Sequence, residues 1–254
     1  MLITRFAPSP TGPLHLGHAY SAMLAHDRAR AAGGTFHLRI DDLDQTRARP
    51  EWEAQIHDDL AWLGLDWPRP ALRQSARLPR YRTALTHLWD MGLLYPCTCT
   101  RSDIRAAVAA PPLGPMPADN ALRLDMARAI KRLDSPLAYL EKDQTVTPQD
   151  MVDTVGDVVL SRRDLGASYH LAVVLDDADQ EITHVIRGED LSGATPIHVL
   201  LQRLLGLASP AYHHHRLIRD ETGKRLAKRD DARAIATYRA AGATPGDIRV
   251  MVGL

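Results

Sequence analysis

Apolar and polar positions alternate along the first third of the chain in a way that predicts strands and helices in turn. Leu2, Ile3 and Phe6 form a short apolar run typical of a strand, and residues 35–40 alternate as a second strand. Between them, residues 19–32 are rich in alanine, which is the composition of a helix. Two amphipathic helices are predicted next, at residues 50–63 and 78–91. This succession favours an α/β fold.

The middle of the chain has a mixed pattern. Residues 100–165 look like an insertion between two halves of a sheet domain. Within this insertion we expect a helix rich in arginine and aspartate at residues 120–133, followed by a valine-rich stretch at residues 145–160. By sequence alone, this part would be a surface subdomain.

Regular patterns return after the insertion. Residues 169–177 predict a strand followed by a turn, and residues 182–191 predict another strand that ends in charged residues. Residues 195–205 carry apolar side chains at helical spacing, and Pro196 suits the first turn of that helix. Residues 212–215, Tyr-His-His-His, are predicted to be a loop. Their successive side chains face different ways, so a metal site is not favoured there.

Composition and charge argue against a strongly basic nucleic-acid binder, a disulfide-stabilised protein and a secreted or membrane protein. The 254 residues can bury a core in one large or two modest domains. The chain has 31 basic and 31 acidic residues, so any contact with nucleic acid must depend on local basic patches. Cys97 and Cys99 lie too close together for a disulfide framework and suit a reducing compartment. No signal peptide or membrane-spanning stretch is evident, so we expect a cytoplasmic protein without membrane contact.

The first candidate site lies where the first strand meets the first helix. Two prolines and Gly12 break the strand, and a helix N-terminus after such a loop favours bound phosphate. His15 and His18 are three residues apart, so both can face that phosphate, and Gly17 lets a nucleotide lie against the backbone. Alone, His-x-Gly-His is a weak signal, since most histidines pack or face solvent. The run Arg-Phe-Ala-Pro-Ser-Pro-Thr-Gly at residues 5–12 makes a chance match less plausible.

These two motifs together resemble the class I glutamyl-tRNA synthetases, whose HIGH motif stands here as His15-Leu16-Gly17-His18. The resemblance implies a Rossmann-like parallel sheet with an inserted subdomain and a short helical C-terminal tail. It divides the chain into two catalytic halves, an insertion that in the family helps to hold the acceptor end of tRNA, and a final segment with the second motif. The first catalytic half is expected at residues 1–99, the insertion at 100–165, the second half at 166–215 and the final segment at 216–254.

The same resemblance implies residues that bind L-glutamate. Asp41 stands where the family has a glutamate that holds the substrate's amino group, although a cluster of acids is more often a solvated turn. Tyr169 would line the pocket, and Arg187 would join Arg5 on the side-chain carboxylate, which a guanidinium fork can bind bidentately. Ser9 would help Asp41 to hold the ammonium group. The first stretch of this binding set is Arg5, Phe6, Ala7, Pro8 and Ser9.

A basic segment near the end resembles the family's second motif, KMSKS. Most charge runs are solvated faces, but Arg225 to Arg229 matches this motif, with Lys228 on the ATP-contacting lysine. Arginine replaces the first lysine and Ala227 replaces the serine. The resemblance thus gives ATP as a substrate, with Mg²⁺ bridging its phosphates. The implied catalytic residues are His15, His18 and Lys228, and the implied ATP-binding residues are His15, Gly17, His18, Arg225 and Lys228.

Cys97 and Cys99 could form half of a tetrahedral zinc site, which needs four nitrogen or sulfur ligands. Relatives with zinc here add ligands roughly ten to thirty residues later. Residues 106–120 contain no cysteine, histidine or tyrosine. We therefore expect no zinc in this chain.

The length favours one branch of the family. Full-length enzymes continue into domains that read the anticodon, whereas this sequence ends just past the second motif. The truncated branch activates glutamate and attaches it to the queuosine base of tRNA(Asp), and we expect that reaction in a monomer without an anticodon-binding domain. The alternatives are a fragment that charges another tRNA, a non-catalytic paralogue that binds tRNA or nucleotide, and a nucleotidyltransferase that makes a small cofactor.

Overall fold

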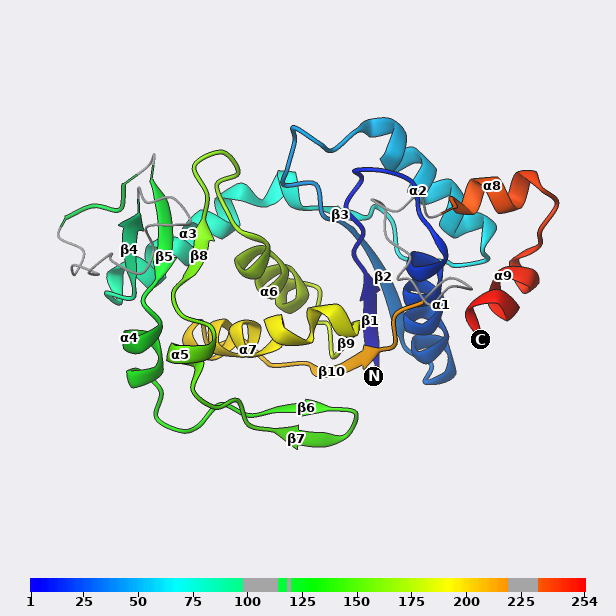
Figure 1. Ribbon diagram of the computed structural model, residues 1–254. Coiled ribbons are helices and arrows are strands. Elements are labelled where there is room, and N and C mark those ends of the chain that lie inside the picture. Colours follow the sequence, from blue (N-terminus) through cyan, green and yellow to red (C-terminus); the bar gives the residue numbers. More distant parts are fainter. Residues whose placement is uncertain (98–113, 118–119, 219–232) are drawn as a thin grey trace.

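A parallel sheet, built from strands near both ends of the chain, forms the centre of the computed structural model, which describes residues 1–97, 114–117, 120–218 and 233–254 (Figure 1). On one side the strand order is β1-β2-β3, and on the other β10 pairs in parallel with both β9 and β6. The Thr183 N–H donates to the Ile3 carbonyl at 3.0 Å, which brings the start of β9 beside β1. These strands are β1 (Ile3–Phe6), β2 (Thr35–Ile40), β3 (Leu72–Arg73), β6 (Tyr139–Glu141), β9 (His184–Gly188) and β10 (Ala211–His215).

Two apolar cores cover the two faces of this sheet. Val185 and Ile186 are neighbours on β9 and point to opposite faces, so each joins a different core. The Ile186 core contains the buried side of α1, and the Val185 core contains α6 and α7. The helices around the sheet are α1 (Leu16–Ala31), α2 (Pro50–Trp62), α3 (Leu78–Asp90), α6 (Tyr169–Asp179) and α7 (Thr195–Leu204). Helices on both faces of a parallel sheet give the α/β arrangement predicted from the sequence.

A smaller antiparallel sheet lies at the far end of the molecule, with strand order β4-β5-β8 (Figure 1). Between β5 and β8 the chain also forms the hairpin β6–β7, whose first strand extends the main sheet beside β10. The four-part division of the chain stays a prediction. The remaining elements are β4 (Leu94–Cys97), β5 (Ala121–Leu124), α4 (Met126–Lys131), β7 (Gln144–Val146), α5 (Met151–Thr154), β8 (Val158–Ser161), α8 (Ile235–Ala240) and α9 (Pro245–Val252), with 3-10 turns η1 (Gln74–Arg77) and η3 (Glu189–Ala194).

Three sequence predictions of secondary structure are wrong. Residues 169–177 form helix α6 instead of a strand, and residues 212–215 belong to strand β10 instead of a loop. The helix expected over 120–133 begins as strand β5 and becomes helical only in α4. A short, continuous apolar run such as Leu171 to Leu175 fits a buried helix as well as a strand, so periodicity could not separate them.

The C-terminal helices pack back onto the first motif. The Ile235 N–H donates to the Leu14 carbonyl at 2.9 Å, which fixes the start of α8 beside the loop before α1. Arg249 on α9 pairs with Asp27 on α1 at 2.6 Å. Among the described residues, no helix combines the length and the apolar character needed to cross a bilayer.

Candidate active site

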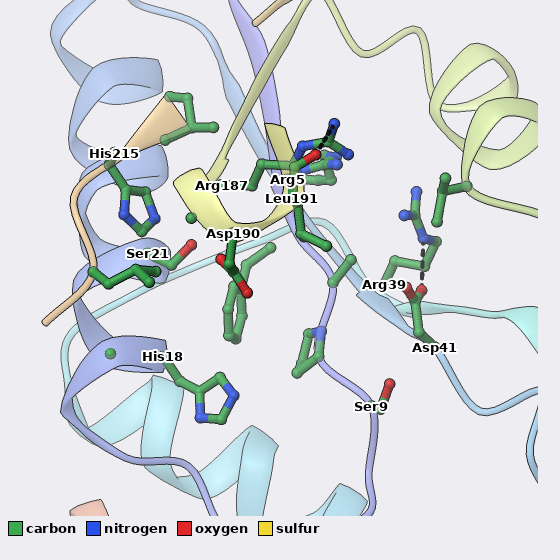
Figure 2. A pocket seen from close by; sticks show the side chains of 18 of the residues that line it. Arg5, Ser9, His18, Ser21, Arg39, Asp41, Arg187, Asp190, Leu191 and His215 are labelled. Atoms are coloured by element: carbon green, nitrogen blue, oxygen red, sulfur yellow. Dashed lines mark hydrogen bonds and ion pairs between the residues drawn. The ribbon is translucent and has the colours of Figure 1, made fainter. Parts of the chain in front are cut away.

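A cavity of about 480 Å³ opens where the carboxyl ends of β1, β2 and β9 meet the first turns of α1 and α6. This is the edge of an open parallel sheet at which ligands bind. Figure 2 shows side chains from these separate segments around one space. Every predicted site residue within the described ranges lines this cavity: Arg5, Phe6, Ala7, Pro8, Ser9, His15, Gly17, His18, Asp41, Tyr169 and Arg187. Arg225 and Lys228 lie outside the described residues.

The two histidines of the first motif form a cap on helix α1. His15 is the N-cap residue, and its Nδ1 accepts the Gly17 backbone N–H at 3.1 Å. The Nδ1 of His18 accepts the His15 backbone N–H at 3.2 Å, and the two ring centroids are 3.8 Å apart. Because each Nδ1 is an acceptor, the proton of each neutral imidazole is on Nε2. Such Nε2–H groups are donors suited to phosphate oxygens, beside a helix N-terminus that also favours an anion.

Gly17 leaves room for this close arrangement. A Cβ atom on residue 17 would lie 3.1 Å from Cε1 of His15 and 3.2 Å from its Nδ1. With any other residue at this position, the His15 ring would have to shift by a few tenths of an ångström.

Arg187 is a buried cation that is held by neutral groups. Its side chain donates to His214 Nε2 at 3.2 Å, to the Leu191 carbonyl at 3.1 Å and to Thr195 Oγ1 at 2.7 Å. It also lies 3.2 Å from His198 Nδ1. Within the described parts of the chain, no carboxylate forms an ion pair with Arg187, although the residue is only 5% exposed. A buried charge without a counter-ion is costly, so this position favours an anionic ligand.

Arg5 differs from Arg187 because it already has a carboxylate partner. Its Nε lies 3.0 Å from Asp177 Oδ1, and its Nη2 lies 3.3 Å from the other oxygen. Arg39, which is fully buried, pairs with the same Asp177 at 2.5 Å. Burial would raise the pKa of Asp177, but the charges of the two arginines lower it to about 2. Part of the Arg5 guanidinium therefore faces the protein, while the residue still lines the cavity.

Asp41 is the only member of the acidic cluster at residues 41–44 that lines the cavity. Its carboxylate accepts a hydrogen bond from Arg39 Nε at 2.9 Å. Burial raises the pKa of Asp41 to about 6, because the charge of Arg39 offsets the loss of solvation only in part. The carboxylate of Asp42 instead accepts hydrogen bonds from the backbone N–H and the hydroxyl of Ser75. Asp44 binds Thr46 and Arg47 on the surface.

Several lining residues were not predicted. Arg39 and Asp190 lie near the carboxyl ends of two predicted strands, so their positions could have pointed to the site. The sequence predicts a loop at His215, but this residue ends β10 and faces the cavity beside Ser21 and Asp190 (Figure 2). The other unpredicted lining residues are Thr11, Ser21, Val173, Ile186, Gly188, Leu191, Leu217 and Ile218.

Of the two cysteines considered as zinc ligands, the structure describes only Cys97. Cys97 is buried at the end of β4, and Cys99 lies outside the described residues. Throughout the described ranges, no group of three or more His, Cys, Asp and Glu side chains is placed to hold a metal ion.

Comparisons with known proteins agree with this geometry. The family model described as tRNA synthetases class I (E and Q), catalytic domain, matches residues 1–112 and 120–253. A protein of Rhodobacter capsulatus named glutamyl-Q tRNA(Asp) synthetase is 57% identical, with all of both chains covered. One of the same name from Nocardia farcinica is 43% identical over 98% of this chain and 82% of its own length.

A solved structure gives the same result for the fold. The crystal structure of a glutamate tRNA ligase from Elizabethkingia meningosepticum, in complex with its amino acid, has a TM-score of 0.77 and 28% sequence identity. This chain is covered completely and spans 60% of that longer chain. The Rossmann-like α/β class predicted from the sequence is thereby confirmed. On its sequence and its fold, the chain belongs to the class I tRNA synthetases for glutamate and glutamine, as a catalytic domain of that family.

Proposed function

We propose that this protein activates L-glutamate with ATP and transfers the glutamyl group to the queuosine base of tRNA(Asp). The observation that carries the proposal is Arg187, a buried guanidinium without a carboxylate partner in the described structure, in the same cavity as the paired imidazoles of His15 and His18. The side-chain carboxylate of an acidic amino acid would pair with the guanidinium, and a triphosphate would accept hydrogen bonds from the two imidazoles. The names of the 57% and 43% identical relatives support glutamate and tRNA(Asp) as the substrates.

In the first step, an oxygen of the α-carboxylate of glutamate attacks the α-phosphorus of ATP, and pyrophosphate leaves. The reaction needs alignment and charge stabilisation more than a protein nucleophile. We assign the side-chain carboxylate of glutamate to Arg187 with Arg5, and its ammonium group to Asp41 and Ser9, with Tyr169 as the wall between them. These residues would fix the α-carboxylate in line with the phosphate.

The imidazoles of His15 and His18 would donate from Nε2 to the phosphates as negative charge develops on the leaving group. Lys228 and Arg225, outside the described residues, are proposed to act on the same phosphates. Mg²⁺ prefers phosphate oxygens and water, so it would enter with ATP and would neutralise part of the triphosphate charge. In the second step, a hydroxyl of the queuosine ring attacks the glutamyl carbonyl, and AMP leaves.

The test has two parts. Glutamate-dependent exchange of pyrophosphate into ATP measures the first step. For the second, labelled glutamate and ATP are supplied with queuosine-containing tRNA(Asp), unmodified tRNA(Asp) and tRNA(Glu) in parallel. We expect label only on the first tRNA. Label on tRNA(Glu) would instead identify an enzyme that charges a tRNA at its 3′ end, and no exchange with any tRNA present would exclude activation.

A further inference from the structure

A line of hydrogen bonds runs from the β6–β7 hairpin to the cavity, across three adjacent strands. Glu141 lies on β6, His214 on β10 and Arg187 on β9. His214 and Arg187 are paired in the parallel register of β10 and β9, and Glu141 is paired with Tyr212, two residues before His214. Side chains two residues apart on a strand share a face, so the three polar groups meet on one side of the sheet.

The contact between Glu141 and His214 is close and involves two N–H groups. The Nδ1 of His214 lies 2.7 Å from each carboxylate oxygen of Glu141, and the His214 backbone N–H donates to Oε1 at 3.3 Å. On the opposite side of the ring, His214 Nε2 accepts from Arg187 Nε at 3.2 Å. A guanidinium N–H can only donate, so Nε2 must carry no proton and Nδ1 must carry it. Glu141 accepts the hydrogen bond from that Nδ1–H and so stabilises the required tautomer.

The imidazole of His214 stays neutral in this place. Burial lowers its pKa, and the charge of Arg187 lowers it further, against the opposing effect of the hydrogen bond to Glu141. Thr195 completes the arrangement: its Oγ1 accepts from Arg187 Nη2 at 2.7 Å and lies 3.1 Å from His214 Nε2. The guanidinium is therefore held in a fixed orientation by acceptors that do not cancel its charge.

This arrangement contrasts with the other buried arginines of the site. Arg5 and Arg39 both contact Asp177 directly, so each shares a full negative charge. A carboxylate in direct contact with Arg187 would compete with the substrate carboxylate for the guanidinium. A neutral imidazole between Glu141 and Arg187 gives the orienting effect of the carboxylate without that competition.

We propose that Glu141 and His214 are positioning residues, which orient Arg187 to bind the side-chain carboxylate of the amino acid substrate. The inference rests on the proposed function and extends it: strand β6 takes part in amino acid recognition through Glu141, although only Arg187 of the three residues lines the cavity.

The experiment compares Glu141→Ala and Glu141→Gln with the parent protein by glutamate-dependent ATP–pyrophosphate exchange and by calorimetric titration with L-glutamate. For Glu141→Ala we expect the KM and Kd for glutamate to rise ~10-fold or more, because Arg187 loses its fixed orientation. The KM for ATP should stay within about twofold. Glu141→Gln keeps an oxygen that can accept from Nδ1–H and should recover part of the affinity. Thr145→Ala, at an exposed position on β7, is the matched control and should change neither constant.

A double-mutant cycle separates positioning from simple docking of the hairpin. If Glu141 acts through His214, adding Glu141→Ala to His214→Ala should raise the Kd for glutamate no further. Additive effects, equal increases in both KM values, or an unchanged Kd in Glu141→Ala would each overturn the inference.

If Glu141→Ala does not fold, Glu141→Gln decides alone: a Kd for glutamate equal to that of the parent would overturn the inference, and a raised Kd would support it. If the parent binds glutamate but gives no exchange, the proposed reaction fails, and the Kd ratios still decide this inference.

Discussion

The positive charge of Arg187 is available to a ligand because the groups that hold its guanidinium are neutral side chains and a backbone carbonyl. The partners nearest to its guanidinium are His198, His214, Thr195 and the Leu191 carbonyl. Burial lowers the pKa of His198 well below its usual value, and the charge of Arg187 adds to this effect. Two imidazoles that stay neutral thus surround one fixed cation.

This geometry predicts that Arg187→Lys weakens glutamate binding. Lysine keeps the charge but has no planar fork, so it loses both bidentate binding and most of the orienting hydrogen bonds. We expect kcat/KM for glutamate to fall by ~10²-fold in pyrophosphate exchange, the scale of a lost preorganised donor. Arg82→Lys, at an exposed position on α3, should have no effect. A normal KM for glutamate in Arg187→Lys would show that another group binds the carboxylate.

The ionisation of Asp41 should make glutamate binding depend on pH. Only its ionised form can hold an ammonium group, and burial raises its pKa to about 6. The Kd for glutamate should therefore rise as the pH falls through about 6, and Asp41→Asn should remove this dependence. Direct titration without ATP is the right measurement, because His15 and His18 face the phosphate side.

Loss of binding at low pH would not reflect unfolding caused by Asp41. Its pKa in the folded protein lies above the ordinary value of 3.8, so the protonated form favours folding. Its contribution to stability is complete below pH 3.8 and is lost as the pH rises through about 6. A Kd that stays constant from pH 7 to pH 5 would contradict the role of Asp41.

At the residue scale, the sequence predicts side chains in motifs better than side chains that support them. Arg5, His15, Asp41 and Arg187 stand in segments that resemble motifs of the family, and all of them line the cavity. The pairing of Arg39 with Asp177 could not be foreseen, because the two residues are 138 positions apart. No local pattern carries such a contact, which depends on the final packing of β2 against α6.

At the scale of elements, helix α6 shows where local patterns are insufficient. The run Leu171 to Leu175 is apolar throughout because both sides of this helix segment are buried. Ser168 is the N-cap, and its hydroxyl accepts the Leu171 N–H at 3.5 Å. A serine before an eleven-residue helix is a start signal that could have corrected the strand prediction. Strand β10 was missed because its three histidines are polar, although two of them are buried.

His15 caps the N-terminus of α1 and is also proposed to donate a hydrogen bond to phosphate. Two substitutions should separate these roles. His15→Ala removes the cap, so we expect a loss of ~1 kcal/mol in the free energy of unfolding. His15→Asn keeps a capping acceptor and should change it by less than ~0.5 kcal/mol. Both should slow pyrophosphate exchange by ~10²-fold, because both remove the imidazole donor.

Urea denaturation and exchange assays on the same proteins test this. Thr244 caps α9, away from the cavity, and its hydroxyl accepts the Asp247 N–H at 3.2 Å. Thr244→Ala is thus a matched control that should lose stability but keep its exchange rate. A fully active His15→Asn protein would mean that His15 serves only as a helix cap.

At the scale of the whole molecule, a buried network of charges joins helix α6 to strands β1 and β2, which are far from it in the sequence. Asp177 on α6 contacts Arg5 on β1 and Arg39 on β2. Next to it, Asp176 accepts hydrogen bonds from Gln74 at 2.9 Å and from Arg77 at 2.7 Å. The sequence order of the motifs predicts that the halves converge. The antiparallel pairing of β4 with β5 and the addition of β6 to the main sheet depend on contacts between distant residues, so local patterns could not reveal them.

This network predicts that Asp177→Asn destabilises the protein strongly. The substitution keeps the shape of the side chain but removes the carboxylate that pairs with buried Arg5, and Arg39 keeps only its pairs with Asp41 and Asp176. Breaking a comparable buried pair costs ~3–5 kcal/mol. Urea denaturation at pH 7 measures the change in the free energy of unfolding. Asp164→Asn, in the exposed pair with Arg162 at 3.0 Å, should change it by less than ~1 kcal/mol.

The pH dependence of stability supplies a second signature of Asp177. Its pKa in the folded protein is about 2, below the ordinary 3.8, so the ionised form favours folding. Its contribution is present above pH 3.8 and is lost as the pH falls through about 2, and it should be absent in Asp177→Asn. The stability difference between parent and variant should therefore shrink with acid. A difference that stays constant from pH 7 to pH 2 would mean that packing of the side chain, and not its charge, joins α6 to β1 and β2.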